Sequence, residues 1–317
     1  MLSRRHKGTI GIIGLGVMGG AFAKNLRAAG WRVIGFDLSC VRCREAKRYG
    51  IRIARSAADV AQEARDVITS LSNAEALDSV SGELARATLK PRVVIETSTF
   101  AIKEKERAEK ILRKAGHIML DCTVSGTGAQ ARTKDLIFYA SGDSKTIKRL
   151  RPVFRDFSRG VYDLGVFGNG SKMKYVANLL VAIHNVSAAE AMVLGMKAGL
   201  DPELVFKLAN AGAGQSRMFE LRGPMMVKND YTSVTATIRV FKKDMHLIGD
   251  FGKKIGVALP LFHATVPIYD EALHSGHAEH DTASVCSVLE RMAKFKRGKS
   301  AGKARKLAGR NGLGGPY

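Results

Sequence analysis

The sequence predicts an α/β domain with a mainly parallel sheet, followed by a domain built from helices alone. Three observations support this prediction. Short apolar runs alternate with helical stretches through the first half of the chain, a glycine-rich turn joins the first run to the first helix, and strand-like runs then disappear. Regular alternation of strands and helices is typical of a parallel sheet covered by helices on both faces.

The first elements are bounded by glycines. Residues 9–14 form an apolar run that ends in glycine, which indicates a buried strand. Residues 17–29 repeat apolar side chains at helical spacing and stop at the next glycine. Residues 31–37 form a second strand-like run. Ser39 is then placed to cap a helix, which Gly50 closes.

Six further apolar runs continue this pattern, and helical stretches fall between most of them. We expect these runs to be strands of the same sheet. They are residues 51–54, 66–71, 92–97, 118–124, 136–141 and 161–164.

The second half of the chain has no strand signal. Residues 171–199 form one continuous helical pattern rich in Ala, Val, Leu and Met. Asp201-Pro202 follows as a helix start, because proline is favoured at the first helical position. We therefore expect a first domain over residues 1–169 and an all-helical domain over residues 170–297. Its later helices are predicted at 216–228, 237–256, 261–275 and 281–297.

Composition limits the class of protein. The 317 residues suffice for two cores, and a hydrophobic content of 45% is typical of a globular chain. No apolar run reaches the ~18 residues that span a bilayer, and no signal-type apolar core follows the basic start. Four cysteines in a chain of this size indicate a reducing compartment. We expect a soluble cytoplasmic protein with no membrane partner.

Positive charge is concentrated at the C-terminus. The net charge is +22, and residues 291–317 contribute nine Lys and Arg and no acidic residue. Six glycines follow Phe295, where apolar periodicity stops, so we expect residues 298–317 to be a disordered basic tail. A solvated tail is favoured over one that binds nucleic acid or acidic lipid. The field of the chain still attracts anionic substrates and dinucleotides.

The glycine-rich turn has the spacing of a dinucleotide-binding loop in a Rossmann-type, doubly wound domain. In G-x-G-x-x-G, Gly14 permits the tight turn, Gly16 lets the backbone approach a pyrophosphate, and Gly19 lets helix and strand pack closely. The helix N-terminus then offers unpaired N–H groups to the phosphates. The residues expected to contact the cofactor here are Gly14, Leu15, Gly16, Val17, Met18 and Gly19.

An acidic residue, Asp37, lies 18 positions after the last glycine of the loop. Its carboxylate can accept hydrogen bonds from the adenosine ribose hydroxyls, and its charge would repel a 2′-phosphate. NAD is therefore favoured over NADP as the cofactor. Arg42 and Arg44 nearby keep NADP as an alternative.

Lys174 and Asn178 follow the segment Gly168-Asn169-Gly170 at the start of the long helix. Four residues apart, they lie on one helical face. Taken alone they fit ordinary helix-surface residues; after the glycines, and with the nucleotide loop upstream, they indicate a dehydrogenase in which a lysine handles the proton. A lysine with a reference pKa near 10.4 acts as a base only where apolar surroundings or nearby cations lower that value.

Five segments, in order along the chain, resemble the β-hydroxyacid dehydrogenase family, which includes 3-hydroxyisobutyrate dehydrogenase and tartronate semialdehyde reductase. The resemblance covers about residues 9–292, and the helical half is most similar to the L-threonate dehydrogenase branch. The segments are the glycine-rich loop with its helix, Leu71-Ser72-Asn73 with Thr97-Ser98-Thr99, Asp121 to Gly126, Gly168 to Asn178, and Phe241 to Met245.

The resemblance implies a fold, a reaction and a set of site residues. It implies a C-terminal domain like that of 6-phosphogluconate dehydrogenase, commonly assembled into homodimers or homotetramers, and hydride transfer between a small anionic 3-hydroxy acid and NAD(P). Lys174 would exchange the proton and Asn178 would hold the substrate hydroxyl. The substrate contacts implied are Ser125, Gly126 and Thr127, and the further cofactor contacts are Leu71, Ser72, Thr99 and Lys243.

The sequence departs from the family pattern in the substrate loop. Thr127 stands where a second glycine is usual, further glycines are usual near Gln130 and Lys134, and Thr123 and Ser72 stand where proline is common. We expect the reaction type to survive these changes, while the substrate stays open. The alternatives are an imine-reducing enzyme, a class that tends to have a different residue at position 174, and a non-catalytic nucleotide-sensing or nucleic-acid-associated protein.

One cysteine pair has the spacing of a metal or redox site. Cys40 and Cys43 are separated by two residues, but Cys122 and Cys286 stand alone, so a second pair is missing. We expect no metal site.

Overall fold

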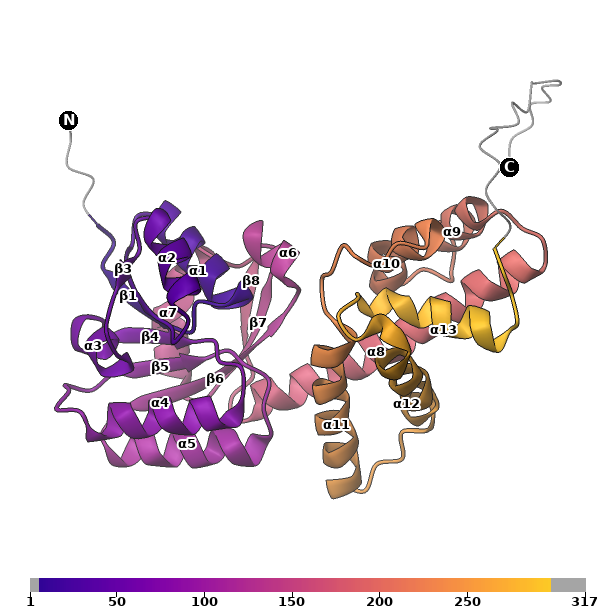
Figure 1. Ribbon diagram of the computed structural model, residues 1–317. Coiled ribbons are helices and arrows are strands. Elements are labelled where there is room, and N and C mark those ends of the chain that lie inside the picture. The colour runs from indigo at the N-terminus through magenta and orange to yellow at the C-terminus, as the bar shows by residue number, and fades with distance from the viewer. Residues whose placement is uncertain (1–5, 298–317) are drawn as a thin grey trace, which may run out of the picture.

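The computed structural model describes residues 6–297, and one eight-stranded sheet organises the first half of them (Figure 1). Its strand order is β3-β2-β1-β4-β5-β6-β7-β8. Neighbouring strands are parallel except β6 and β7, so β7 and β8 run opposite to the other six. The strands are β1 (Thr9–Ile13), β2 (Arg32–Phe36), β3 (Arg52–Ile53), β4 (Asp66–Thr69), β5 (Val93–Glu96), β6 (Ile118–Ser125), β7 (Ile137–Ser141) and β8 (Gly160–Asp163).

Strand order reverses on either side of β1. Strands β2 and β3 extend the sheet in one direction, and β4 to β8 extend it in the other. Loops that leave the carboxyl ends of β1 and β4 therefore diverge, and ligands of doubly wound folds bind at such a switch point. The glycine-rich turn leaves β1 at this position.

Helices cover both faces of the sheet, as the alternating pattern predicts. One face packs against α1 (Val17–Ala28), α2 (Cys40–Arg48) and α7 (Ser144–Arg155). The other packs against α3 (Ala57–Glu63), α4 (Ala74–Arg86) and α5 (Ile102–Lys114), the last two side by side in Figure 1. All eight predicted strand segments form strands, and Ser39 caps α2 by accepting a hydrogen bond from the N–H of Arg42.

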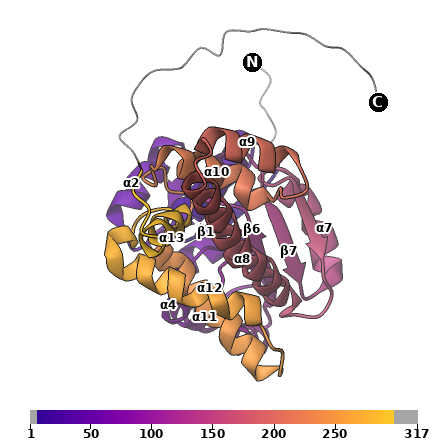
Figure 2. The same cartoon turned by 90° about the vertical axis from the view of Figure 1, so that its right-hand side faces the viewer.

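Helix α8 (Asn169–Lys197) connects the two halves of the molecule. Its first turn packs on β6 and β7, so closely that a side chain at Gly170 would collide with the backbone oxygens of Tyr139 and Asp121. Figure 2 shows the rest of α8 running through the helical half. Around it lie α9 (Pro202–Ala211), α10 (Arg217–Lys228), α11 (Ile238–Lys254), α12 (Pro260–Ala272) and α13 (Val285–Met292).

Three details of the helices were not predicted. A short helix, α6 (Gly128–Arg132), follows β6, and the helix expected over 261–275 changes to a π-helical turn (Leu273–His277) in which Gly276 has a φ of 88°. That glycine adopts a left-handed conformation that stops regular α-helix. The helix expected over 281–297 is shorter, because α13 starts after a 3₁₀ turn (Thr282–Ser284). The predicted tail, 298–317, lies outside the described residues.

Among residues 6–297, α8 is the one helix long and apolar enough to cross a membrane, with a mean hydropathy of 1.6 in its most apolar window of 18 residues. Half of that window is buried inside the protein. The expectation that no apolar run reaches this length missed α8, because polar residues occur among its apolar ones. Its packing shows that it is a core helix.

Candidate active site

Each glycine of the nucleotide loop occupies a distinct environment. Gly14 has a φ of 91°, and a side chain there would collide with the backbone oxygen of Ser70. A side chain at Gly19 would collide with the carbonyl of Gly14, whereas Gly16 faces open space. Helix α1 begins directly after Gly16 with no side-chain cap. The loop therefore presents open backbone and uncapped N–H groups, an arrangement that fits a bound pyrophosphate.

Asp37 directly follows β2 and binds the backbone of this loop. One carboxylate oxygen accepts a hydrogen bond from the N–H of Leu15 at 2.7 Å, and the other accepts one from the N–H of Ser39 at 2.7 Å. The carboxylate is half-buried and each oxygen keeps a further lone pair. Asp37 thus fixes the glycine loop against the residues that follow β2.

A cavity of about 700 Å³ lies between the sheet domain and the helical domain. Several predicted site residues line it together. They are Val17, Met18, Leu71, Thr99, Ser125, Gly126, Thr127, Lys174, Asn178 and Lys243. The predicted residues Gly14, Leu15, Gly16, Gly19 and Asp37 lie outside its lining and belong to the loop after β1. Ser72 is exposed and also lies outside the lining.

Lys174, in the second turn of α8, extends into this cavity and is half-buried. Burial lowers the pKa of Lys174, the nearby carboxylate of Asp244 raises it, and the ammonium of Lys243 lowers it again; the net shift is downward. A lysine with a lowered pKa has a larger fraction of neutral amine near neutral pH. Burial in the cavity therefore favours the neutral amine of Lys174.

Asp244 was not identified as a site residue from the sequence, although it lies within the segment Phe241 to Met245 that resembles the family. It lies on α11, and its Oδ2 accepts a hydrogen bond from Nδ2 of Asn178 at 2.8 Å. Its Oδ1 is 3.5 Å from Nζ of Lys243, and burial raises the pKa of this carboxyl group against the opposing effect of the two lysines. Because 66 residues separate Asn178 from Asp244, no local pattern could predict their contact.

Lys243 joins the two domains beside the cavity. Its ammonium donates a hydrogen bond to the backbone oxygen of Thr99 at 2.6 Å and lies 5.2 Å from the ring centroid of Phe100. Thr99 belongs to the segment after β5, and Lys243 belongs to α11. The contact therefore ties the helical domain to the strand end that the resemblance assigns to the nicotinamide.

The predicted substrate loop begins where β6 ends. Ser125 is the last residue of that strand, and Gly126 has a φ of 129°, a value that other residues avoid. The N–H of Thr127 donates to Oε1 of Gln130 at 3.0 Å, which caps α6. The N–H of Thr127 is therefore used within the loop.

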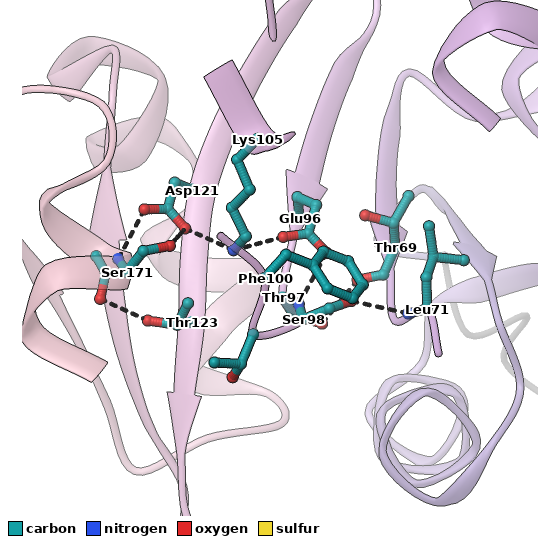
Figure 3. A network of polar contacts seen from close by, with 12 residues as sticks. Thr69, Leu71, Glu96, Thr97, Ser98, Phe100, Lys105, Asp121, Thr123 and Ser171 are labelled. Atoms are coloured by element: carbon teal, nitrogen blue, oxygen red, sulfur yellow. Dashed lines mark hydrogen bonds and ion pairs between the residues drawn. The ribbon is translucent and has the colours of Figure 1, made fainter. Parts of the chain in front are cut away.

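A fully buried ionic network lies beneath the site (Figure 3). Nζ of Lys105 lies 2.6 Å from Oε2 of Glu96 and 2.8 Å from Oδ1 of Asp121, and all three side chains are excluded from solvent. Burial alone would lower the pKa of Lys105, but the two carboxylates outweigh it and raise the pKa. The three side chains therefore carry one excess negative charge.

The first turn of α8 faces that excess charge. The N–H of Ser171 donates to Oδ2 of Asp121 at 2.7 Å, and its hydroxyl donates to Oδ1 at 3.0 Å (Figure 3). The positive end of a helix dipole stabilises a carboxylate in this position. Lys174 is one turn farther along the helix. The network thus fixes the start of the helix that carries the candidate base.

The same network reaches the predicted cofactor side of the cavity. Oε1 of Glu96 accepts a hydrogen bond from the N–H of Ser98 at 2.8 Å, and the hydroxyl of Ser98 accepts one from the N–H of Leu71 at 2.8 Å (Figure 3). The hydroxyl of Tyr175 donates to the carbonyl of Phe100 at 2.6 Å. Strand ends from the sheet domain are thereby connected to the turn of α8 next to Lys174.

Neighbouring lysines have other partners. Lys172 is exposed and donates to Asn169 at 3.0 Å, within its own helix. Lys242 pairs with Asp270 at 2.6 Å and lines a separate cavity of about 460 Å³ between α11 and α12. In residues 6–297 no group of three or more His, Cys, Asp or Glu side chains is placed to hold a metal ion.

Comparison with known families divides the chain at the start of α8. Residues 9–167 match the family described as the NAD binding domain of 6-phosphogluconate dehydrogenase. Residues 168–289 match the family described as the NAD-binding domain of NADP-dependent 3-hydroxyisobutyrate dehydrogenase.

Individual relatives cover nearly the whole chain. The L-threonate dehydrogenase of Cupriavidus necator is 34% identical, over 88% of this chain and 95% of its own. The mitochondrial 3-hydroxyisobutyrate dehydrogenase of Rattus norvegicus is 29% identical, over 92% of this chain and 90% of its own. The crystal structure of a 3-hydroxyisobutyrate dehydrogenase from Salmonella typhimurium superposes with a TM-score of 0.79 at 29% identity, covering 89% of this chain and all of that one.

Proposed function

Since the chain belongs to the NAD(P)-dependent β-hydroxyacid dehydrogenase family of the 3-hydroxyisobutyrate dehydrogenase type, we propose that it interconverts a small 3-hydroxy acid and its oxo acid or semialdehyde. Lys174 acts as the general base and acid. A sugar acid such as threonate is our guide to the reacting end of the substrate, because L-threonate dehydrogenases are among the relatives above 30% identity. The observation that carries the proposal is the lowered pKa of Lys174 in the cavity between the domains.

Proton exchange at Lys174 completes the redox step. Bound nicotinamide supplies or accepts the hydride. In the oxidative direction, the neutral amine of Lys174 takes the proton from the substrate hydroxyl; in the reductive direction, its ammonium returns a proton to the forming alkoxide. Asp244 helps to hold the ammonium once it has formed, because opposite charges nearby favour the charged state of both groups.

Two further sets of groups orient the substrate, one at its carboxylate and one at its reacting hydroxyl. The backbone N–H groups of Ser125 and Gly126 and the hydroxyl of Ser125 bind the substrate carboxylate. Asn178 holds the reacting hydroxyl through its amide. Its Nδ2 group is already hydrogen-bonded to Asp244, so the amide is fixed in one orientation before substrate arrives. An amide anchored in this way loses little side-chain entropy on binding.

We propose NAD as the preferred cofactor. The carboxylate of Asp37 lies beside the open loop at Gly16, where it accepts ribose hydroxyls and repels a 2′-phosphate. The environments of Gly14, Gly16 and Gly19 fit a pyrophosphate at the start of α1. Lys243 and Thr99 would hold the nicotinamide half beside Lys174.

A homodimer or homotetramer in the cytoplasm is the form we propose for the protein. Val176, Leu180 and Leu194 of α8 and Leu204 and Leu208 of α9 are exposed. Large apolar side chains gathered on adjacent helices are typical of surfaces that become covered on assembly. The basic, anion-attracting charge of the chain suits a small anionic hydroxy acid as the ligand.

A substrate panel tests the proposed function. Three- to six-carbon 3-hydroxy acids and the corresponding semialdehydes are assayed with NAD and with NADP, and cofactor reduction or oxidation is followed by absorbance. We expect turnover of at least one 3-hydroxy acid with NAD preferred. Absence of turnover across the panel, with NAD bound normally, would contradict the proposal.

A further inference from the structure

The ionisable side chains that line the cavity form two separate groups and one isolated ion pair. Lys174 and Lys243 gather around Asp244, as described above. Arg222 is buried and pairs with Asp281, its Nε 2.9 Å from Oδ1. The remaining ionisable residues of the lining are Arg132, Asp135, Arg159 and Arg217.

These four residues form the second group. Asp135 is its one acidic member, and two of the arginines pair with its carboxylate. Its Oδ1 lies 3.3 Å from Nη1 of Arg159, and its Oδ2 lies 3.8 Å from Nη2 of Arg217. Arg159 immediately precedes β8, whereas Arg217 is the first residue of α10, so the carboxylate bridges the two domains across the cavity. Arg217 also pairs with Glu220 at 2.8 Å, but Glu220 does not line the cavity.

Arg132, at the end of α6, is exposed to the same cavity. Among residues 6–297, no carboxylate lies within 4.0 Å of its guanidinium. Three guanidinium groups therefore line this part of the cavity against one carboxylate. Arginine forks match planar carboxylates and phosphates, so a local surplus of guanidinium groups is suited to an anionic group of the ligand.

Hydrogen bonds connect the arginines to the proposed carboxylate loop. Gln130 accepts from the N–H of Thr127 at 3.0 Å and donates to Oδ2 of Asp135 at 3.0 Å. Gly126 packs on the same segment, since a side chain there would meet Leu136 at 2.5 Å and the carbonyl of Asp135 at 3.4 Å. The arginine group thus borders the place where the first substrate carboxylate would bind.

The link lies in a segment that departs from the family pattern. The family usually has glycines near Gln130 and Lys134. Lys134 still adopts a φ of 62°, so the turn keeps its shape without glycine. Gln130 meanwhile adds the side chain that connects Thr127 with Asp135. This loop therefore retains the fold of its segment while offering a different surface to the ligand.

We propose that Arg132, Arg159 and Arg217 form a second anion-binding subsite, and that the substrate is a hydroxy acid with a second anionic group, a carboxylate or a phosphate, at the end remote from the first carboxylate. The inference rests on the proposed function for the identity of the reacting end. Asp135 holds Arg159 and Arg217 in place and competes with the ligand for them. Removal of the Asp135 charge should therefore strengthen binding of the second anion, and removal of an arginine charge should weaken it.

Three matched substrates distinguish the sources of the second anion. L-threonate has a neutral hydroxymethyl end, its 4-phosphate ester has a phosphate there, and 3-hydroxyglutarate has a second carboxylate. We expect kcat/KM for at least one of the two doubly anionic compounds to exceed that for L-threonate by about tenfold or more, the ratio that one additional charge-assisted contact gives. Added NaCl should reduce this preference, because partly exposed ion pairs are screened.

Variants of the subsite test the assignment to these residues. Arg159→Gln and Arg217→Gln should each lower kcat/KM for the preferred doubly anionic substrate by about tenfold, with little change for L-threonate. Asp135→Asn should change the same ratio in the opposite direction. Arg155→Gln provides the matched control, because Arg155 is an exposed arginine of α7 outside the cavity lining.

Binding to the NAD-loaded protein, measured by calorimetry with 3-hydroxyglutarate and the phosphate ester, tests the subsite without requiring turnover. Weaker binding in the arginine variants supports the subsite even if the reaction were a different one. Equal effects on singly and doubly anionic ligands, or no effect of Arg159→Gln, Arg217→Gln and Asp135→Asn on either, would overturn it. A failure of the substrate panel combined with normal binding of the doubly anionic ligand would count against the proposed function alone.

Discussion

The amine of Lys174 is governed by two neighbours of opposite charge. Asp244 favours the ammonium and Lys243 disfavours it, while burial acts in the same direction as Lys243. The chain separates these neighbours from Lys174 by many residues, and the fold brings them together in one cavity. Single charge changes around Lys174 should therefore move the pH dependence of the reaction in a known direction.

Asp244→Asn should shift the pH profile of oxidation. Oxidation needs the neutral amine, so its rate falls as pH drops below the pKa of Lys174. Because Asp244 raises this pKa, its neutralisation lowers it, and the acidic limb moves to lower pH. The profile of kcat against pH measures the shift. Asp250→Asn, an exposed position on the same helix, should leave the limb in place, and a limb moving to higher pH in Asp244→Asn would contradict the assignment.

Asp37 has two tasks that substitutions can separate. Asp37→Asn removes the charge and keeps one oxygen for the N–H of Leu15, although it loses the acceptor for the N–H of Ser39. NADP use should therefore rise while the loop keeps its contact at Leu15. Asp37→Ala also removes the anchor and should erode the NAD-over-NADP ratio of kcat/KM by about tenfold or more, with weaker binding of both. An unchanged ratio in both variants would refute the role of Asp37.

At the scale of elements, the start of α8 joins the helical domain to the sheet. Its first turn is fixed on β6 and β7 through Gly170 and through the bonds of Ser171 to Asp121. Lys105 supplies the cation that allows Asp121 to lie buried beside Glu96. Removal of one partner from a buried ionic group leaves charge uncompensated, which is more damaging than removal of the whole group.

Lys105→Met should therefore lower the free energy of unfolding by about 3–5 kcal/mol and reduce kcat through a misplaced Lys174. Adding Glu96→Gln to that variant should recover part of the loss, because one buried charge is then removed. Chemical denaturation and kcat measure both effects. Lys110→Met, an exposed lysine of the same helix, is the control. A double variant no more stable than Lys105→Met would show that charge compensation is not the role of Lys105.

At the scale of the whole molecule, the sequence allows most of the architecture to be predicted. The strands and the glycine loop were predictable because each is a local pattern of apolar residues and glycines. The antiparallel pairing of β7 with β6 was not, since pairing direction depends on contacts across the sheet. Within the candidate site, Lys174 and Asn178 were visible as a spacing, whereas Asp244 and Lys105 act through partners on other elements.

The basic C-terminal segment, residues 298–317, lies outside the described residues. No proposed role in hydride or proton transfer falls on it. Deletion of residues 298–317 should leave kcat and KM unchanged. Steady-state kinetics of the shortened chain check this. If catalysis were lost while fold and NAD binding stayed normal, the separation of the enzyme core from the tail would be wrong.

The most direct test of the central claim is a single-turnover measurement of hydride transfer by Lys174→Met, with NAD affinity measured on the same preparation. The account predicts a rate lower by about 10²–10⁴, nearly unchanged NAD affinity, and a normal rate for the control Lys172→Met. A normal transfer rate in Lys174→Met, or a loss explained by failure to bind NAD, would contradict it.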